Sequence, residues 1–323
     1  MPPASSRVRK SPARSRGVAV IPEGVRDVDL TVAGHPLHLS NLAKPFWPAL
    51  GITKGDLLRY YAAIAPVLVP HLKDRAMVMK RYPNGARGKC FFMKRAPSPR
   101  PDWIETCAIE HESKSVIDFP MVQDAAALLW VVNLGCIDLN QWYSRCDDIN
   151  RPDYLHFDLD PAAGASFERV LEVAIIVRDA LEKLGMHTYV KTSGATGVHV
   201  YVPIVRGPLQ KEVWKFAKAL AQHIAAEHPK IATSEYIIAK RPRGRVFVDY
   251  NQNAWGKTLA SVYSVRPTKS ATVSTPVTWD EIERGIRPED FTMDVTLARV
   301  KEHGDMWKGL LAARGRVKLE KLL

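Results

Sequence analysis

The chain has 323 residues, of which 46% are hydrophobic and 25% charged. This is ordinary globular composition, and it excludes a wholly disordered chain, a collagen and a coiled coil. Lysine and arginine number 46 against 34 acidic residues, so the formal net charge is +12. We therefore expect a polyanionic partner, although charge alone leaves nucleic acid, acidic lipid and simple solubility open. No apolar run approaches the ~20 residues of a membrane span, and we expect no membrane partner.

Residues 1–24 are predicted to form a basic disordered tail, because residues 1–16 carry five cations and no acid among Pro and Ser. This N-terminus has no apolar stretch typical of a secretory signal. The four cysteines, Cys90, Cys107, Cys136 and Cys146, form no C-x-x-C pair. Their spacing favours reduced, buried thiols over a disulfide framework or a zinc ribbon, so we expect no zinc.

Periodicity predicts the first elements in chain order. A helix begins at Thr53 with a capping-box-like Asp56, and apolar residues recur along it at helical spacing. Two β-like runs follow at 76–82 and 90–94, joined by a turn-rich Pro-Asn-Gly. A further helix is predicted over 124–134.

From residue 155 the pattern alternates between strand and helix. Strands are predicted at 155–160, 187–192, 198–204, 245–250 and 258–265, with helices from Ser166 to Leu184 and from Pro208 to about Glu227. The order β-α-β-β-α-β is that of a split βαβ, RRM-like antiparallel sheet with both helices on one face. The helix-free face of such a sheet suits a nucleic acid.

The most informative strand reads His-Phe-Asp-Leu-Asp-Pro and ends with Asp158 and Asp160. Because side chains alternate along a strand, both carboxylates point the same way. Adjacent carboxylates repel unless a cation lies between them, and Mg²⁺ and Mn²⁺ prefer such ligands. Two solvated acids at a strand end are the alternative.

Asp249 interrupts the apolar strand Val-Phe-Val-Asp-Tyr, which is costly unless the carboxylate is paired or binds a metal. If this strand lies beside the first, Asp249 completes a cluster able to hold two divalent cations. Pairing with Arg245 or with a backbone amide is the alternative for Asp249 alone.

A glycine-containing turn, Lys-Thr-Ser-Gly-Ala-Thr-Gly-Val-His at 191–199, lies between two predicted strands. Glycines let the backbone approach a ligand closely, and the hydroxyls and His199 can contact phosphate. The turn is not a Walker A motif, and a glycine-containing hairpin often has no function.

These three segments, FDLDP, KTSGATGVH and VFVDYNQN, occur in this order and resemble the archaeo-eukaryotic primase superfamily, specifically the polymerase domain of bacterial DNA ligase D. The resemblance extends to 39–61, to MKRYPNG at 79–85 and to SVYSVR at 261–266. It implies an α+β fold with an RRM-like antiparallel catalytic sheet and an additional N-terminal α/β subregion. The implied division is one domain at 25–305 (subregions 25–150 and 151–305), followed by a basic tail at 306–323.

The resemblance also implies the roles of individual residues. Asp158, Asp160 and Asp249 correspond to the catalytic, metal-binding triad for two Mn²⁺ or Mg²⁺ ions. The nucleotide-binding residues would be Lys191, Ser193, Gly194, Thr196, Gly197, His199, Gln252 and Arg266. A downstream 5′-phosphate would be bound by Asn41, Lys44 and Lys54, and template or primer DNA by Lys80, Phe91, Phe92, Lys240, Arg241, Arg243 and Arg245. Without the resemblance, we would interpret Lys44 and Lys54 as ordinary surface lysines, and Phe91 and Phe92 as one core ring and one surface ring.

Two positions depart from the family pattern. Asn140 stands where many members have His in the motif before Trp142, and Thr196 stands where they often have Lys. We therefore expect the triphosphate to be bound more weakly or in a different arrangement, and the metal triad to be unaffected.

The resemblance implies a template-directed nucleotidyltransferase that fills gaps and extends 3′ ends during non-homologous end joining, with a preference for ribonucleotides. Its partners would be gapped or broken DNA ends with a 5′-phosphate, NTP or dNTP, a Ku homologue and an ATP-dependent DNA ligase. We expect a cytoplasmic, nucleoid-associated monomer. A de novo primase, a non-catalytic DNA-end-binding scaffold and a metal-dependent nuclease are the alternatives. No K-x-D-G ligase nucleophile is present, so we expect a stand-alone polymerase or one domain of a longer protein.

Overall fold

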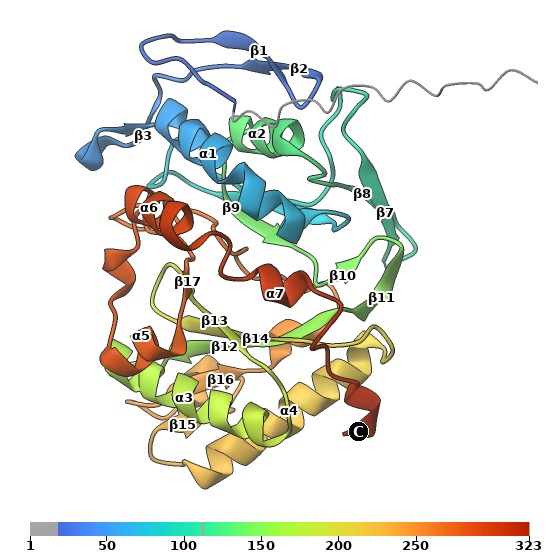
Figure 1. Ribbon diagram of the computed structural model, residues 1–323, viewed down its shortest axis with the longest axis vertical. Coiled ribbons are helices and arrows are strands. Elements are labelled where there is room, and N and C mark those ends of the chain that lie inside the picture. The colour runs from blue at the N-terminus through green and yellow to red at the C-terminus, as the bar shows by residue number, and fades with distance from the viewer. Residues whose placement is uncertain (1–18, 112, 323) are drawn as a thin grey trace, which may run out of the picture.

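The computed structural model describes residues 19–111 and 113–322, which form two halves stacked one above the other (Figure 1). The upper half contains β1 (Val28–Val32), β2 (His35–Leu39), β3 (Pro45–Trp47), β4 (Ile52–Thr53), α1 (Lys54–Leu72), β5 (Met77–Arg81), β6 (Phe91–Met93), β7 (Thr106–Glu110), β8 (Val116–Pro120), α2 (Ala125–Asn133), β9 (Cys136–Gln141), β10 (Ser144–Arg145) and β11 (Asp148–Pro152). The lower half contains β12 (Tyr154–Pro161), α3 (Phe167–Lys183), β13 (Tyr189–Thr192), β14 (Val198–Pro203), α4 (Gln210–Glu227), β15 (Ala232–Thr233), β16 (Val246–Asp249), the short helix η3 (Asn251–Asn253), β17 (Pro276–Val277) and α5 (Trp279–Arg284). These are followed by α6 (Met293–His303), α7 (Lys308–Leu311) and the short helix η5 (Leu319–Lys321).

The lower half is built on a six-stranded sheet with the order β15-β16-β12-β14-β13-β17. Every pairing is antiparallel except that of the short edge strand β15 with β16. The predicted β-α-β-β-α-β order is confirmed, with α3 and α4 together on one face (Figure 1). Ser166 caps α3 by accepting a hydrogen bond from the Arg169 amide.

Alternation along β12 decides what each sheet face contacts. Leu155, Phe157 and Leu159 are fully buried in the core beneath α3 and α4, together with valines of β14 and β16. The intervening residues of β12 point to the opposite face, so the acidic residues of this strand lie away from the helices.

The strand predicted at 258–265 is absent, and this prediction is wrong. Tyr263 has a φ of 62°, a left-handed conformation that interrupts an extended strand. The segment is instead held by single hydrogen bonds, such as that from the Ser261 amide to the Leu139 carbonyl. The edge of the sheet beside β13 is formed by β17.

In the upper half, α1 and α2 pack on the three-stranded sheet β6-β5-β9. The predicted helix at Thr53 is confirmed with a complete capping box, since Thr53 and Asp56 each accept a hydrogen bond from the other's amide. Asp124 similarly caps α2. Within the described residues, no helix combines the length and apolar character that a membrane crossing requires.

The helix-free face of the lower sheet is largely covered by the upper half. Tyr143, Tyr154, His156, Tyr201 and Trp307 form a buried aromatic layer there, with ring centroids of His156 and Tyr201 5.1 Å apart and of Tyr201 and Trp307 4.9 Å apart. The open nucleic-acid platform expected from the RRM-like order is therefore reduced to the end of the sheet that carries the acidic residues.

Parts of the segments predicted as tails, 1–24 and 306–323, pack on the body of the protein. Residues 1–18 lie outside the described residues, but Ile21 is buried in the upper core. At the other end, residues 306–322 pack on the body: Trp307, Leu310 and Leu319 are buried, and Arg316 donates to the backbone carbonyls of Asp153 and Ile204. The apolar residues spaced between the cations decide this, because they bury surface that a solvated tail would leave exposed.

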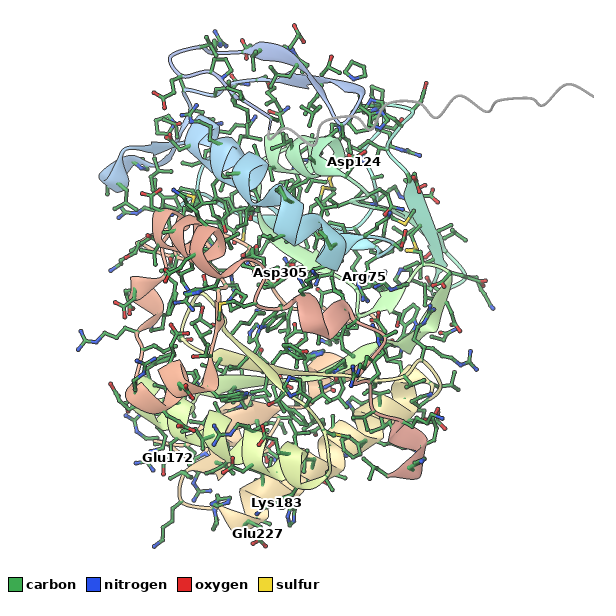
Figure 2. The ribbon with its side chains drawn as sticks, in the orientation of Figure 1. Arg75, Asp124, Glu172, Lys183, Glu227 and Asp305 are labelled. Atoms are coloured by element: carbon green, nitrogen blue, oxygen red, sulfur yellow. A yellow bond between two sulfur atoms is a disulfide. The ribbon has the colours of Figure 1, made fainter. Side chains whose placement is uncertain are left out.

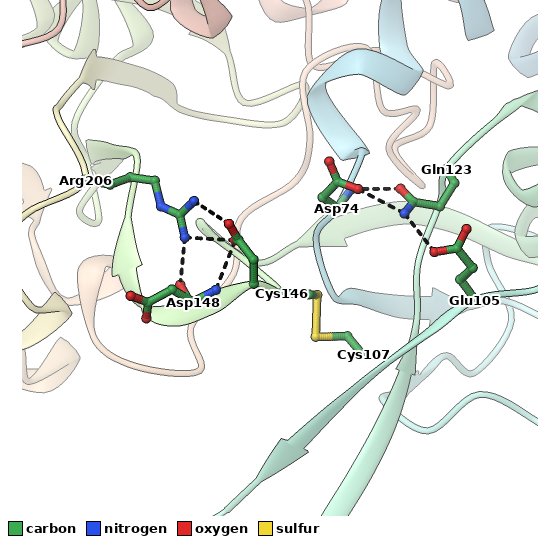
Figure 3. The surroundings of a disulfide bond; sticks show 8 residues. Asp74, Glu105, Cys107, Gln123, Cys146, Asp148 and Arg206 are labelled. Carbon is green, nitrogen blue, oxygen red and sulfur yellow. Dashed lines mark hydrogen bonds and ion pairs between the residues drawn. A yellow bond between two sulfur atoms is a disulfide. The ribbon is translucent and has the colours of Figure 1, made fainter.

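Cys107 and Cys146 are joined by a disulfide, which contradicts the expectation of four reduced thiols (Figure 3). The bond links β7 to the turn between β10 and β11, where the two Cα atoms lie 5.9 Å apart. The sequence separation of 39 between the two cysteines gives no signal, because their proximity is created by both segments packing around Trp142. Cys90 and Cys136 are free.

A buried ion pair joins the two halves. Arg75, fully buried after α1, donates to both carboxylate oxygens of Asp153 at 2.7 and 2.8 Å, and Arg145 approaches the same carboxylate at 3.1 Å. Figure 2 labels Arg75 and Asp305, which both lie between the halves in this view. Asp305 receives a hydrogen bond from Tyr263 and lies 2.9 Å from the ring nitrogen Nε2 of His71.

Asp153→Ala should lower the free energy of unfolding by roughly 3–5 kcal/mol, because it leaves the Arg75 guanidinium buried without a counter-ion. Asp147→Ala is the matched control: it removes a carboxylate that is 67% exposed and paired with Arg206, and should cost less than about 1 kcal/mol. Urea denaturation measures both. Equal costs would show that the buried pair does not stabilise the association of the halves.

Candidate active site

The candidate site lies at the end of the central strand β12, where β12 and β16 bring three acidic side chains together and β14 adds a histidine. Asp158 is directly opposite Asp249 of β16 on one side and opposite His199 of β14 on the other. Asp160 lies two residues further along the same face of β12. Asp158 and Asp249 are buried, whereas Asp160 is half-buried. The register thus brings together the three acids that the sequence predicted as a triad.

The three carboxyl groups perturb one another strongly. Burial raises the pKa of Asp158 to about 6, against the opposing effect of Lys191 and Arg266. Repulsion from Asp158, then burial, raises the pKa of Asp160 to about 7. Burial and Asp158 likewise raise the pKa of Asp249. The three carboxylates therefore repel one another, and binding of protons or cations reduces this repulsion.

The donor set suits a hard divalent cation. Oδ1 of Asp158 is buried without a hydrogen-bond donor, although Nε2 of His199 lies 3.1 Å away. Asp249 is fixed by two hydrogen bonds, from the Asn251 amide at 2.7 Å and from Nε2 of Gln252 at 3.0 Å. In the described part of the chain, no three His, Cys, Asp or Glu side chains converge into a ready-made metal cage. The fit rests on the carboxylate chemistry and the orphaned oxygen.

Lys191 lies behind His199 and not on the surface of the site. Its Nζ is 2.8 Å from Nδ1 of His199 and donates to the Ala260 carbonyl at 3.1 Å. Burial lowers the pKa of Lys191 well below its usual value, and burial together with Lys191 does the same to His199. His199 is thus held as a neutral imidazole whose Nε2 faces Asp158, and Lys191 is placed as a positioning residue.

The turn at 193–197 approaches β12 so closely that its glycines are required. A Cβ at Gly197 would lie 2.5 Å from the Leu159 carbonyl oxygen and 3.0 Å from Oδ1 of Asp160. Gly194 has a φ of 71°, and a Cβ there would meet the Arg266 side chain. Oγ of Ser193 accepts hydrogen bonds from the amides of Ala195 and Gly197 and thereby shapes the turn. Thr196 is exposed at its tip.

Asp138 of β9 is a buried anion that the sequence reasoning did not recognise as part of the site. Its two carboxylate oxygens lie 2.8 Å from Nε of Arg266 and 3.4 Å from Nζ of Lys80, so it links a predicted nucleotide contact to a predicted template contact. Arg266 also donates to the Ser193 carbonyl. The signal in the sequence was an acid in the otherwise uncharged strand Cys-Ile-Asp-Leu-Asn-Gln. Asn140, which departs from the family pattern, donates to the Asp138 carbonyl at 3.2 Å.

Asn41, Lys44 and Lys54 come together at the start of α1. The Lys44 amide donates to the Asn41 carbonyl, and the Lys54 amide to the Lys44 carbonyl. Lys54 is only 5% exposed, and its Nζ donates to the Ser40 carbonyl at 2.7 Å. Burial, and then repulsion from Lys44, lowers the pKa of Lys54 to about 8. This cluster is a small cationic site separate from the acidic triad.

Phe91 and Phe92 are both exposed, by 43% and 62%, on the edge strand β6. Cations lie against each ring: Nζ of Lys80 is 5.5 Å from the Phe92 centroid, and the Arg81 guanidinium 5.3 Å from that of Phe91. Apolar rings that stay exposed beside cations are typical of surfaces that stack unpaired bases.

The basic segment 240–245 precedes β16 and lies at the rim of the acidic site. The Arg241 guanidinium stacks 3.7 Å from the Phe247 ring centroid, and its charge opposes the rise of the Asp158, Asp160 and Asp249 pKa values. Arg241 also donates to the carbonyls of Glu235 and Tyr236. Lys240 and Arg243 are exposed and Arg245 is half-buried, so Arg241 is the member fixed toward the triad.

Comparison with known proteins identifies the family. Residues 53–307 match the family model of the LigD primase-polymerase domain. The chain belongs to this family. It is 34% identical over 274 residues to the multifunctional non-homologous end joining protein LigD of Mycolicibacterium smegmatis, with 84% of this chain and 35% of that protein covered. For the bifunctional LigD of Bacillus subtilis, the identity is 29% over 272 residues, with 84% and 43% covered.

A solved structure agrees. The polymerase domain of Mycobacterium tuberculosis ligase D in complex with DNA superposes with a TM-score of 0.80 at 31% identity, covering 85% of this chain and 98% of that one. The predicted fold class, an α+β fold with a primase-type core, is therefore confirmed. The chain spans only 35% to 43% of the length of the LigD proteins of M. smegmatis and B. subtilis.

Gly197→Ala should destabilise this LigD-family chain by roughly 1–3 kcal/mol, because the new methyl group would overlap the backbone of β12 and displace Asp160. Thr196→Ala changes an exposed residue of the same turn and should stay within about 0.5 kcal/mol of the parent. Chemical denaturation compares the two variants. A Gly197→Ala variant as stable as the Thr196→Ala variant would mean that the turn can move away from β12.

Proposed function

We propose that this chain is a metal-dependent, template-directed nucleotidyltransferase that fills gaps and extends 3′ ends at DNA double-strand breaks in non-homologous end joining. The observation that carries the proposal is the register of β12, which sets Asp158 opposite Asp249 and His199 with Asp160 on the same face. Membership of the LigD primase-polymerase family supports it.

Asp158, Asp160 and Asp249 would hold two divalent cations, Mn²⁺ or Mg²⁺. Such ions, when bound, lower the pKa of a primer 3′-hydroxyl and stabilise the charge of a leaving pyrophosphate. The chain's own contribution is to hold the three carboxylates in one place despite their repulsion. Gln252 and the Asn251 amide fix Asp249, so that its carboxylate stays oriented toward the other two.

The incoming triphosphate would lie along the turn at 193–197. Its glycines leave room for phosphate oxygens, and Ser193, His199 and Arg266 are the donors that face it. Lys191 would not contact the triphosphate directly, but would act through His199 by fixing the orientation of its imidazole. Exposed Thr196 supplies a neutral hydroxyl where many family members carry a cation.

DNA would be held on both sides of the triad. We propose that Asn41, Lys44 and Lys54 bind the 5′-phosphate of a downstream strand. Phe91, Phe92 and Lys80 would contact the template, and the segment 240–245 the primer end. We also propose that the enzyme prefers ribonucleotides and that it cooperates with a Ku homologue and an ATP-dependent ligase.

Asp158→Ala and Asp160→Ala should each reduce nucleotide incorporation on a gapped, 5′-phosphorylated duplex by at least ~100-fold, since each removes a ligand from a site worth several kcal/mol of transition-state stabilisation. The assay supplies rNTP or dNTP with Mn²⁺ or Mg²⁺, and circular dichroism checks the fold. Asp147→Ala, which removes an exposed carboxylate that is not part of the triad, should keep parental activity. Full activity in both triad variants would refute the proposal.

Lys54 should make recognition of the 5′-phosphate depend on pH. Because the pKa of Lys54 is lowered to about 8, the lysine is charged below that pH and becomes neutral above it. The affinity advantage of a 5′-phosphate over a 5′-hydroxyl should therefore fall about tenfold by pH 9. Fluorescence anisotropy with both DNA ends, from pH 7 to 9.5, measures this advantage.

Lys54→Arg is the matched control, because a guanidinium stays charged over the whole range and should flatten the pH dependence. An unchanged pH profile in Lys54→Arg would assign the titration to another group and would remove Lys54 from the phosphate site.

A further inference from the structure

The outer face of α4 carries two neighbouring hollows that the proposed activity does not use. The first, about 490 Å³, lies at the start of α4 and is lined by Leu209, Gln210, Lys211, Trp214, Ala254 and Trp255, with Asn150 at its edge. The second, about 380 Å³, lies near the middle of the helix and its lining includes Lys218, Gln222, Tyr236, Arg245 and Tyr250. Figure 1 shows α4 along the lower edge of the molecule, on the far side of the sheet from the upper half.

Trp214 and Lys218 lie where the two hollows adjoin. Trp214 lines the first, and its ring lies 5.8 Å from that of Tyr250, which lines the second. Nζ of Lys218, a lining residue of the second, lies 5.1 Å above the Trp214 ring. We call this surface, from Trp255 to Arg245, the α4 groove. Tyr250 directly follows Asp249, so the groove ends beside the catalytic strand but on the helix side of the sheet.

The first hollow contains a buried polar atom without a partner. Gln210 is 4% exposed, and its amide nitrogen donates to the Ala254 carbonyl at 3.3 Å, yet its Oε1 receives no hydrogen bond. A buried acceptor left unpaired is unfavourable, so a ligand that donates an N–H here would recover part of that cost. The neighbouring Trp214 and Trp255 offer indole surface on which a planar group can stack.

The cations along the groove are available. Lys211, Lys215 and Lys218 recur at helical spacing on one side of α4, and within residues 19–111 and 113–322 none of them forms an ion pair with an acid. The two nearby acids are engaged with backbone amides: Glu212 accepts from the Leu209 amide and Glu235 from the Ile237 amide. Lys211, Lys215, Lys218 and Arg245 nevertheless outnumber Glu212 and Glu235, four cations against two acids, so the net charge of the groove is positive.

We propose that the α4 groove binds single-stranded nucleic acid. An unstacked base would enter the first hollow, stack on Trp214 or Trp255 and donate from its edge to Oε1 of Gln210. The phosphates would follow Lys211, Lys215 and Lys218 toward Arg245 and the rim of the catalytic site. Aromatic rings interleaved with cations match a single strand, because bases in a duplex have no free face for stacking.

The groove goes beyond the proposed function, since it is a second nucleic-acid surface on the opposite side of the sheet from the acidic triad. Its position beside β15 and β16 would guide a single-stranded tail past the basic segment 240–245 to the active site. The chemistry of the groove does not require bound metal or nucleotide, so its occupancy can be measured without either.

The test is binding of a labelled 20-nucleotide oligo-dT and of a blunt 20-base-pair duplex to the whole chain, without metal or nucleotide, over a range of salt. Lys215→Glu/Lys218→Glu should weaken oligo-dT binding about tenfold or more and lower the slope of log affinity against log salt by roughly 1.4, for two lost phosphate contacts. The matched control is Lys183→Glu/Lys301→Glu, which makes the same change of net charge on α3 and α6; Figure 2 labels Lys183.

Gln210→Leu separates binding from folding. It removes the unpartnered oxygen together with the hydrogen bond to the Ala254 carbonyl, and because these two effects oppose each other the free energy of unfolding should change little, whereas oligo-dT affinity should fall several-fold. Incorporation on a short gapped duplex without a free tail should stay at the parental level in Lys215→Glu/Lys218→Glu, while Asp158→Ala should lose incorporation and keep oligo-dT binding. These two readouts distinguish failure of the groove from failure of the proposed activity.

Three results would overturn the proposal. They are an equal loss of oligo-dT binding in the control double variant, an equal loss of duplex and oligo-dT binding in Lys215→Glu/Lys218→Glu, or unchanged oligo-dT binding in that variant.

Discussion

Repulsion among three carboxylates at the end of β12 is the constraint on which the rest of the structure depends. A sheet tolerates such a cluster only when its backbone is held rigidly and when cations stand close by. The first condition is met by the apolar residues that alternate with the acids on β12 and anchor the strand in the core beneath α3 and α4. The second is met by Arg241 and Arg266, which approach from two different loops.

The upper half also contributes to the surroundings of the acidic cluster. Tyr143 of the upper half and Trp307 pack on the rings of His156 and Tyr201, and these aromatic rings cover the sheet up to the point where the acids begin. The upper half also supplies Asp138, which holds Arg266 beside the glycine turn, and the exposed Phe91 and Phe92. The candidate site is therefore formed at the junction between the halves, and the buried Arg75–Asp153 pair helps to fix that junction.

The sequence predicted the elements whose signals are local. Thr53, Asp124 and Ser166 mark helix starts by their capping chemistry, and strict alternation on β12 placed Asp158 and Asp160 on one face. It did not predict contacts created by packing alone: the Cys107–Cys146 disulfide, the breaking of the expected strand at Tyr263, and the burial of Lys191 behind His199. In each case the deciding neighbour is distant in the chain, and no pattern within a short window records it.

Asp138 gives the site a property that a single ion pair would not. Because its carboxylate has two cationic neighbours, Arg266 and Lys80, one of them can turn toward a phosphate while the other still neutralises the buried charge. Recruitment of Arg266 by a ligand thus need not leave an isolated anion in the interior. Asp138 is thus a shared counter-ion: Arg266 can bind a ligand while Lys80 keeps the buried Asp138 carboxylate paired.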